Sequence, residues 1–209
     1  MKLNNKRTIL VGLAFLSICA FWQMYDSVVP LILTKTFHMN ETFSGAIMAA
    51  DNILALFLLP FFGSLSDRSH SKIGKRMPFI LFGTGCAVIL MNILPLLDNS
   101  YAAQPSGLKT ASFVIVLGLL LVTMGTYRSP AVALMPDVTP KPLRSRANAI
   151  INLMGAVGGI LYLGVAAVLY PNSKTAGLDH VNYQPLFIVV SAIMFIAIAV
   201  LFLTVKEPK

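Results

Sequence analysis

The sequence predicts an all-α membrane protein with six transmembrane helices. Its 209 residues are 56% hydrophobic and only 11% charged, with a mean hydropathy of +0.78. So few polar residues cannot cover a water-soluble globule of this size. Six apolar stretches follow one another, each near the roughly 20 residues that a helix needs to cross a bilayer. None shows the two-residue alternation of a membrane β-strand.

The predicted helices alternate with short polar connections and form one bundle over residues 1–209. They cover residues 8–34, 43–65, 77–97, 111–135, 147–170 and 185–205. The first stretch starts like a secretory signal, but it is too long, contains Asp26 and precedes five further spans, so we expect a retained helix. The connections 98–110 and 171–184 are polar and contain Pro and Gly, as exposed loops do.

The distribution of cations predicts the orientation of the bundle. Three of the 16 Lys and Arg residues, Lys35, Lys109 and Lys174, fall on one side, and Arg128 lies within a span. The other twelve fall on the opposite side: Lys2, Lys6, Arg7, Arg68, Lys72, Lys75, Arg76, Lys141, Arg144, Arg146, Lys206 and Lys209. This bias places both termini in the cytoplasm, with the plasma membrane as the expected location. Because the cations lie in short loops, the net charge of +8 does not indicate nucleic-acid binding.

Cysteine and histidine residues predict no metal site, and we expect no cofactor. Cys19 and Cys86 both lie within apolar spans, and their separation in the sequence does not match the short spacings of metal-binding cysteines. His38, His70 and His180 lie in predicted loops, where we expect them to be solvated. The spans contain no G-x-G-D motif, no H-E-x-x-H motif and no Ser/His pair, so an intramembrane enzyme is not expected.

Three ionisable residues lie within the predicted spans: Asp26, Asp51 and Arg128. A charge in hydrocarbon costs at least about 2.5–3.5 kcal/mol, so such residues normally face the bundle interior or a wet cavity. With a rise of about 1.5 Å per residue, Asp26 and Asp51 both lie about 12 Å below the outer surface and Arg128 about 25 Å below it. The first, second and fourth helices are therefore predicted to line a cavity.

The predicted pathway combines two acids with an aromatic and polar surface. Two carboxyl groups at one level can share a proton, so Asp26 and Asp51 are candidates for coupling proton movement to substrate. Arg128 could bind hydroxyl groups or neutralise an acid, and an aromatic ring beside polar groups suits a sugar. Alternatively, the acids are structural and the aromatic residues form an interfacial belt. The complete predicted pathway is Asp26, Asp51, Arg128, Gln23, Trp22, Tyr25, Asn52 and Asn152.

Two polar segments carry a family resemblance. The first is G-S-L-S-D-R-S-H-S-K-I-G-K-R-M-P at residues 63–78, between the second and third spans. The second is T-Y-R-S-P-A-V-A-L-M-P-D at residues 126–137, followed by R-S-R-A-N-A at 144–149. Topology alone would require cations in the first segment but neither its glycines nor its acid. Both segments resemble the major facilitator superfamily, in the variant of the glycoside and sucrose-type cation symporters.

The resemblance implies an N-terminal six-helix half of a major facilitator fold, built from two inverted three-helix repeats. The first, second, fourth and fifth helices would surround the substrate path, and the third and sixth would stand outside. It also implies a cytoplasmic charge latch in which Asp137 is the partner of Arg68. The implied gating residues are Gly63, Asp67, Arg68, Gly74, Lys75, Arg76 and Asp137. Independently, Gly155-x-x-x-Gly159 in the fifth span, together with Gly158, Gly164, Ala166 and Ala167, is a weak signal for close helix packing.

The predicted function is secondary active transport, with proton-coupled uptake of a sugar or glycoside by alternating access. The expected partners are a small-molecule substrate, a coupling cation, with a proton favoured, and the lipid bilayer. Because the second half of such a transporter is absent, a missing C-terminal half or a second copy is also expected. The alternatives are a six-helix scaffold, a homo-oligomeric half-transporter without independent transport, and drug or metabolite efflux by the same fold.

Overall fold

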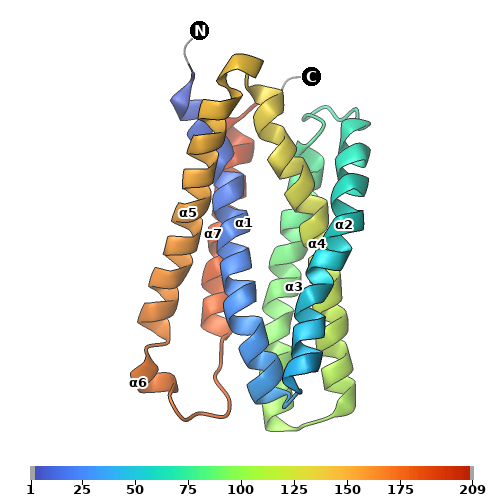
Figure 1. The fold of residues 1–209 in the computed structure, drawn as a ribbon, viewed down its shortest axis with the longest axis vertical. Helices are drawn as coiled ribbons and strands as arrows, with labels where there is room; N and C mark the ends of the chain where they lie inside the picture. Colours follow the sequence, from blue (N-terminus) through green and yellow to red (C-terminus); the bar gives the residue numbers. More distant parts are fainter. Residues whose placement is uncertain (1–2, 208–209) are drawn as a thin grey trace.

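The computed structural model describes residues 3–207, so the predicted cytoplasmic cations Lys2 and Lys209 lie outside the described residues. The described chain contains six long helices of 21 to 32 residues, each apolar enough to cross a membrane (Figure 1). This confirms the predicted all-α architecture of six spans. The elements are α1 Asn5–Leu31, η1 Ile32–Thr36, α2 Glu41–Asp67, α3 Met77–Ala103, α4 Gly107–Val138, η2 Lys141–Leu143, α5 Arg144–Leu169, α6 Asn172–Thr175 and α7 Gln184–Thr204.

Polar residues extend several helices beyond the predicted apolar stretches. Asn4 caps α1, because its Oδ1 accepts a hydrogen bond from the backbone N–H of Arg7 at 3.1 Å. Asn40 caps α2 in the same way, with the N–H of Thr42 as donor at 2.9 Å. At its other end, α1 continues as the π-helical turn η1. Side-chain caps satisfy backbone groups that a helix end would otherwise leave unpaired, so the helices begin in polar turns.

The two ends of the bundle differ in what they hold. Both termini lie at the same end, together with the α2–α3 connection and η2 (Figure 1). The α3–α4 connection, α6 and the loop before α7 lie at the other end. We call these the inner end and the outer end, respectively.

α1 lies at the centre of the bundle and α2 at its edge. α1 packs against α5, α7 and α4, while α3 packs against α4 and α7. α2 packs mainly on α4, and none of the most apolar 18-residue stretch of α2 is buried. Ile53, Leu56 and Phe57 of α2 are more than 60% exposed. Such an apolar surface is stable against lipid or another protein rather than water.

Tyr127 joins three helices near the inner half of the bundle. Its side chain is completely buried, its hydroxyl donates to the carbonyl oxygen of Ala14 at 3.0 Å, and it also pairs with the hydroxyl of Ser17. Gly83 of α3 allows the approach, because a Cβ there would lie 2.7 Å from the Cβ of Tyr127. The contact fixes α4 against α1 and α3.

The glycines of α5 provide a close approach to α1, as the small residues of the fifth span predict. A Cβ at Gly155 would lie 2.9 Å from Sγ of Cys19, and a Cβ at Gly158 would collide with the carbonyl group of Leu16. A Cβ at Gly159 would meet nothing nearer than 3.8 Å. The closest contacts are therefore made by Gly155 and Gly158, whereas Gly159 has room for a Cβ beside Gln23 of α1.

Two residues expected in exposed loops are less exposed than predicted. α3 continues to Ala103, so Asp98 lies within the helix and is 0% exposed. The expectation of no ionisable side chain in the third helix is therefore wrong. His180 is only partly exposed, with hydrogen-bond contacts to Thr36 and Asn99. Its predicted solvation is wrong because the loop before α7 folds back over the outer ends of α1 and α3.

Candidate functional site

A small hollow between α1, α2 and α4 contains three of the predicted pathway residues. Its lining consists of Trp22, Asp51, Ala55, Leu58, Leu59, Leu121, Gly125 and Arg128. The hollow measures about 10 Å³, which is enough for about one water molecule. The six helices therefore bring two opposite charges and an aromatic ring to one cavity wall.

Arg128 is positioned by Trp22. The guanidinium carbon of Arg128 lies 5.3 Å from the centre of the Trp22 ring, which is a cation–π distance. Trp22 is held by edge-on contacts with Phe21 and Tyr25, at centroid distances of 5.2 and 5.3 Å. Tyr25 is 1% exposed. An interfacial aromatic belt would leave these rings at the bilayer surface, so the packing favours the cavity role for Trp22.

Asp51 and Arg128 occupy opposite ends of the hollow. Gly125 of α4 faces Leu58 of α2, with 3.1 Å between a Cβ built at Gly125 and the Cβ of Leu58. Arg128 lies three residues beyond this level and Asp51 seven residues before it, so their backbones differ by about 15 Å along the helices. The ion pairs of the described residues do not join them. Asp51 instead accepts a hydrogen bond from the Asn52 amide at 2.9 Å.

Asp26 lies one turn beyond Trp22 toward the outer end of α1. Its side chain is exposed. Gln23 is turned toward α5, because its Oε1 lies 3.8 Å from a Cβ built at Gly159. Asn152 of α5 is exposed. The predicted residues thus divide into a charged wall on α1, α2 and α4 and a polar flank toward α5.

Arg76 is the centre of a second cluster, at the inner end. Its side chain is 8% exposed. The Nε atom donates to Oδ2 of Asp137 at 2.9 Å, and one terminal nitrogen donates to Oδ1 of Asp67. The other terminal nitrogen donates to Oγ of Ser66 at 2.5 Å and to the carbonyl oxygen of Gly63 at 3.3 Å. One guanidinium group therefore joins the inner ends of α2, α3 and α4.

The expected pairing of Arg68 with Asp137 is wrong. Asp137 forms its ion pair with Arg76 instead, because the turn after α2 brings the start of α3 back between α2 and α4. Arg68 forms the C-cap of α2 and is exposed, as is Lys75.

Gly63 of α2 lies close to α4. A Cβ at Gly63 would lie 3.0 Å from Oγ of Ser129, and the Ser129 hydroxyl group donates to the carbonyl oxygen of Leu59 at 2.8 Å.

Glu207 completes the inner cluster, and sequence reasoning did not identify it. Its carboxylate accepts the backbone N–H of Arg76 at 2.9 and 3.1 Å and that of Met77 at 3.2 Å, so it caps the first turn of α3. Gly74 has φ of 116° and lies directly against Glu207, so a side chain at residue 74 would be both strained and obstructed. In the sequence, Glu207 is marked only by its position shortly after the last span, in V-K-E-P.

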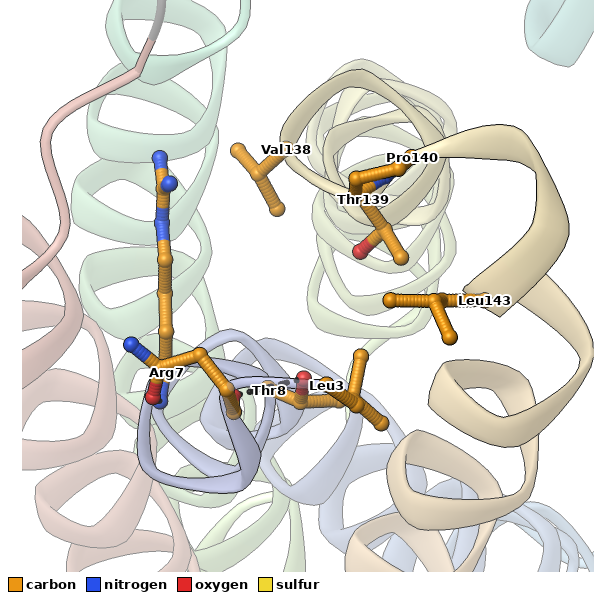
Figure 2. Close-up of a pocket in the computed structure, with 8 residues that line it drawn as sticks. Leu3, Arg7, Thr8, Val138, Thr139, Pro140 and Leu143 are labelled. Atoms are coloured by element: carbon orange, nitrogen blue, oxygen red, sulfur yellow. Dashed lines mark hydrogen bonds between the residues drawn. The ribbon is translucent and has the colours of Figure 1, made fainter. Parts of the chain in front are cut away.

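A roomier hollow of about 260 Å³ also lies at the inner end (Figure 2). Its lining consists of Leu3, Asn4, Arg7, Thr8, Val138, Thr139, Pro140 and Leu143. The guanidinium group of Arg7 is engaged with the carbonyl oxygen of Lys206 at 2.9 Å. The hollow lacks the acid and the aromatic ring of the hollow around Trp22, so the latter is the better candidate site.

Comparison with known proteins agrees with this architecture. A sequence model of the Major Facilitator Superfamily matches residues 11–209. The chain is 34% identical over 145 residues to a sucrose transport protein of Arabidopsis thaliana, which covers 64% of this chain and 24% of that protein. It is 33% identical over 141 residues to a sucrose transport protein of Oryza sativa subsp. indica, covering 61% and 28%. It is 26% identical over 179 residues to the alpha-ketoglutarate permease of Escherichia coli (strain K12), covering 84% and 38%.

The chain spans only 24% to 38% of the length of these relatives. The family match, in contrast, extends over nearly all of the chain and includes every long helix. The chain is a multi-pass membrane protein that belongs to the Major Facilitator Superfamily.

Proposed function

We propose that the chain is one six-helix half of a secondary active transporter that takes up a sugar or glycoside together with a proton. The observation that carries the proposal is the wall of Trp22, Asp51 and Arg128, which line one hollow between α1, α2 and α4. Relatives named as sucrose transport proteins support the choice of substrate class. The inner end would face the cytoplasm of a plasma-membrane protein, because most of the cations lie there.

In this proposal the two ends of the wall perform different tasks. The Trp22 ring offers an apolar face to a sugar ring, and Arg128 offers donors to its hydroxyl groups. Asp51, about 15 Å away along the helices, would exchange the proton with Asp26 at a similar level of the outer third. Protonation of this pair would change the charge of the wall and so its affinity for water and substrate.

The hollow in these helices holds about one water molecule and cannot hold a sugar. The substrate would therefore bind between this wall and a second six-helix unit, supplied by a C-terminal half or by a second copy. The Arg76 cluster would tie α2, α3 and α4 at the inner end and release them during alternating access. Such a tie needs two arrangements of similar free energy, which a partly exposed ion-pair cluster can provide.

Removing the proton-exchanging acids is expected to abolish coupled uptake. In membrane vesicles that contain the protein in its native assembly, Asp26→Asn and Asp51→Asn should each reduce uptake of labelled sucrose driven by a pH gradient at least tenfold. Glu41→Gln, which removes an exposed carboxyl group from the first turn of α2, is the matched control and should retain uptake. Full pH-driven uptake by both Asp variants would remove the coupling mechanism. Labelled 2-oxoglutarate in place of sucrose tests a dicarboxylate substrate.

Sugar binding is expected to change the fluorescence of Trp22, which is the only tryptophan of the chain. Millimolar sucrose should shift its emission in the unchanged protein, because substrate replaces water beside the indole ring. Arg128→Gln should weaken the response at least tenfold, whereas Arg146→Gln, which removes an exposed arginine from the first turn of α5, should change it less than threefold. A response that survives Arg128→Gln unchanged would place the sugar elsewhere.

A further inference from the structure

The outer ends of α1 and α3 and the segment before α7 meet at a buried carboxyl group that lies outside the proposed pathway. Asp98 is 0% exposed, and neither of its carboxyl oxygens has a hydrogen-bond partner within the described part of the chain. The Nδ1 atom of His180 lies 3.9 Å from Oδ1 of Asp98. An unpaired buried carboxylate is costly, so the group requires a proton, either its own or one on its neighbour.

Neighbouring amide groups determine which ring nitrogen of His180 carries the hydrogen. The backbone N–H of Gln184 can only donate, so Oδ1 of Asn182, 3.0 Å away, is the acceptor. The amide nitrogen of Asn99 donates to the same oxygen at 2.9 Å. This turns Oδ1 of Asn99 toward Nε2 of His180 at 3.0 Å. Because an amide oxygen only accepts, Nε2 bears the hydrogen of the neutral ring.

Nδ1 of His180 is therefore the atom that binds an added proton. In the neutral ring, Nδ1 accepts a hydrogen bond from the Thr36 hydroxyl group at 3.1 Å. Once protonated, Nδ1 donates to the Thr36 oxygen, and the hydroxyl group can turn its own hydrogen toward Asp98, whose Oδ1 lies 3.9 Å from the same ring nitrogen. One proton thus converts an unpaired carboxylate into a charge-assisted pair bridged by a hydroxyl group.

We propose that Asp98, His180 and Thr36 form a proton-binding site at the outer end, separate from the hollow of Asp51 and Arg128. The three residues come from α3, from the segment before α7 and from η1 at the end of α1. Proton binding therefore strengthens a tie between three parts of the bundle. An acidic medium at the outer end holds these parts together, and a more alkaline medium loosens them.

Other titratable groups surround the site but do not replace it. Lys35, His38, Tyr101 and Asp179 line an adjoining hollow of about 160 Å³ together with Thr36 and His180. Lys35, His38 and Asp179 are exposed, so salt and water screen their charges. Burial, followed by the charge of Asp98, raises the pKa of Tyr183, so this phenol stays neutral while the site takes up its proton.

Nitrogen NMR of the histidine rings in detergent micelles tests the proposal on the chain itself. The chain has three histidines, so His→Gln variants assign each signal. Neutral His180 should carry its hydrogen on Nε2, and acidification should protonate Nδ1. Asp98→Asn should lower the proton affinity of His180 at least tenfold. Asp179→Asn, which removes an exposed carboxyl group next to His180 in the sequence, should lower it less than threefold.

Two results would overturn the proposal. One is a neutral His180 with its hydrogen on Nδ1, which is measured on the unchanged chain and so does not depend on the folding of any variant. The other is an equal effect of Asp98→Asn and Asp179→Asn, which would mean that general surface charge controls the ring. Neither measurement involves transport, so a failure of the proposed transport function leaves this test intact.

Discussion

Arg76→Ala is expected to lower the free energy of unfolding by about 2 kcal/mol, because it removes the buried cation and its charge-assisted hydrogen bonds at the centre of the inner cluster. Asp67 and Asp137 would lose their shared partner, and the oxygen atoms of Ser66 and Gly63 would lose their donor. The two carboxylates would also repel each other. The value is below that for a broken buried pair, since the two carboxylates left behind are 61% and 37% exposed and stay solvated.

Arg68→Ala is the matched control for this prediction. Arg68 has the same charge and belongs to the same loop, but it is exposed, so its removal should change the free energy of unfolding by less than about 0.5 kcal/mol. Circular dichroism during SDS titration of the purified chain measures both variants. Arg76→Lys should fall between them, because an ammonium group cannot reach α2 and α4 at once. Equal stability of Arg76→Ala and Arg68→Ala would show that the cluster does not hold the inner end together.

The sequence was sufficient to predict the number and type of the long elements. Apolar stretches of membrane length determine helices directly, because unpaired backbone groups are not tolerated in hydrocarbon. The ends were less predictable, since polar residues such as Asn4 and Asp98 lie within or next to helices that the apolar pattern terminates earlier. The apolar pattern therefore predicts a loop at Asp98, whereas α3 includes this residue.

The candidate site was predictable in its residue types but not in its partners. Asp51 and Arg128 stand out as charges in apolar stretches, and the structure brings both to one hollow. In the loop, four cations within nine residues gave no basis for choosing Arg76 over Arg68. That choice depends on how the chain turns between α2 and α3. Glu207 and His180 act across more than 80 residues of sequence, so local patterns could not reveal them.

Gly158→Ala is expected to destabilise the bundle by about 3 kcal/mol, which is the upper end of the usual cost of overpacking. The added methyl group would collide with the carbonyl group of Leu16 and would lie 3.0 Å from its Cα. Backbone atoms of α1 cannot rotate away as a side chain can. α5 would therefore have to shift along its whole contact with α1, the central helix of the bundle.

Gly164→Ala on the same helix separates this collision from the general effect of replacing glycine. A Cβ at Gly164 would meet nothing within 4 Å, so the substitution should be neutral or stabilising by up to about 1 kcal/mol through better helix propensity. The same SDS titration compares the two variants. A similar stability for both would mean that α5 is free to move away from α1. The small residues at 155 and 158 would then not be required for packing α5 against α1.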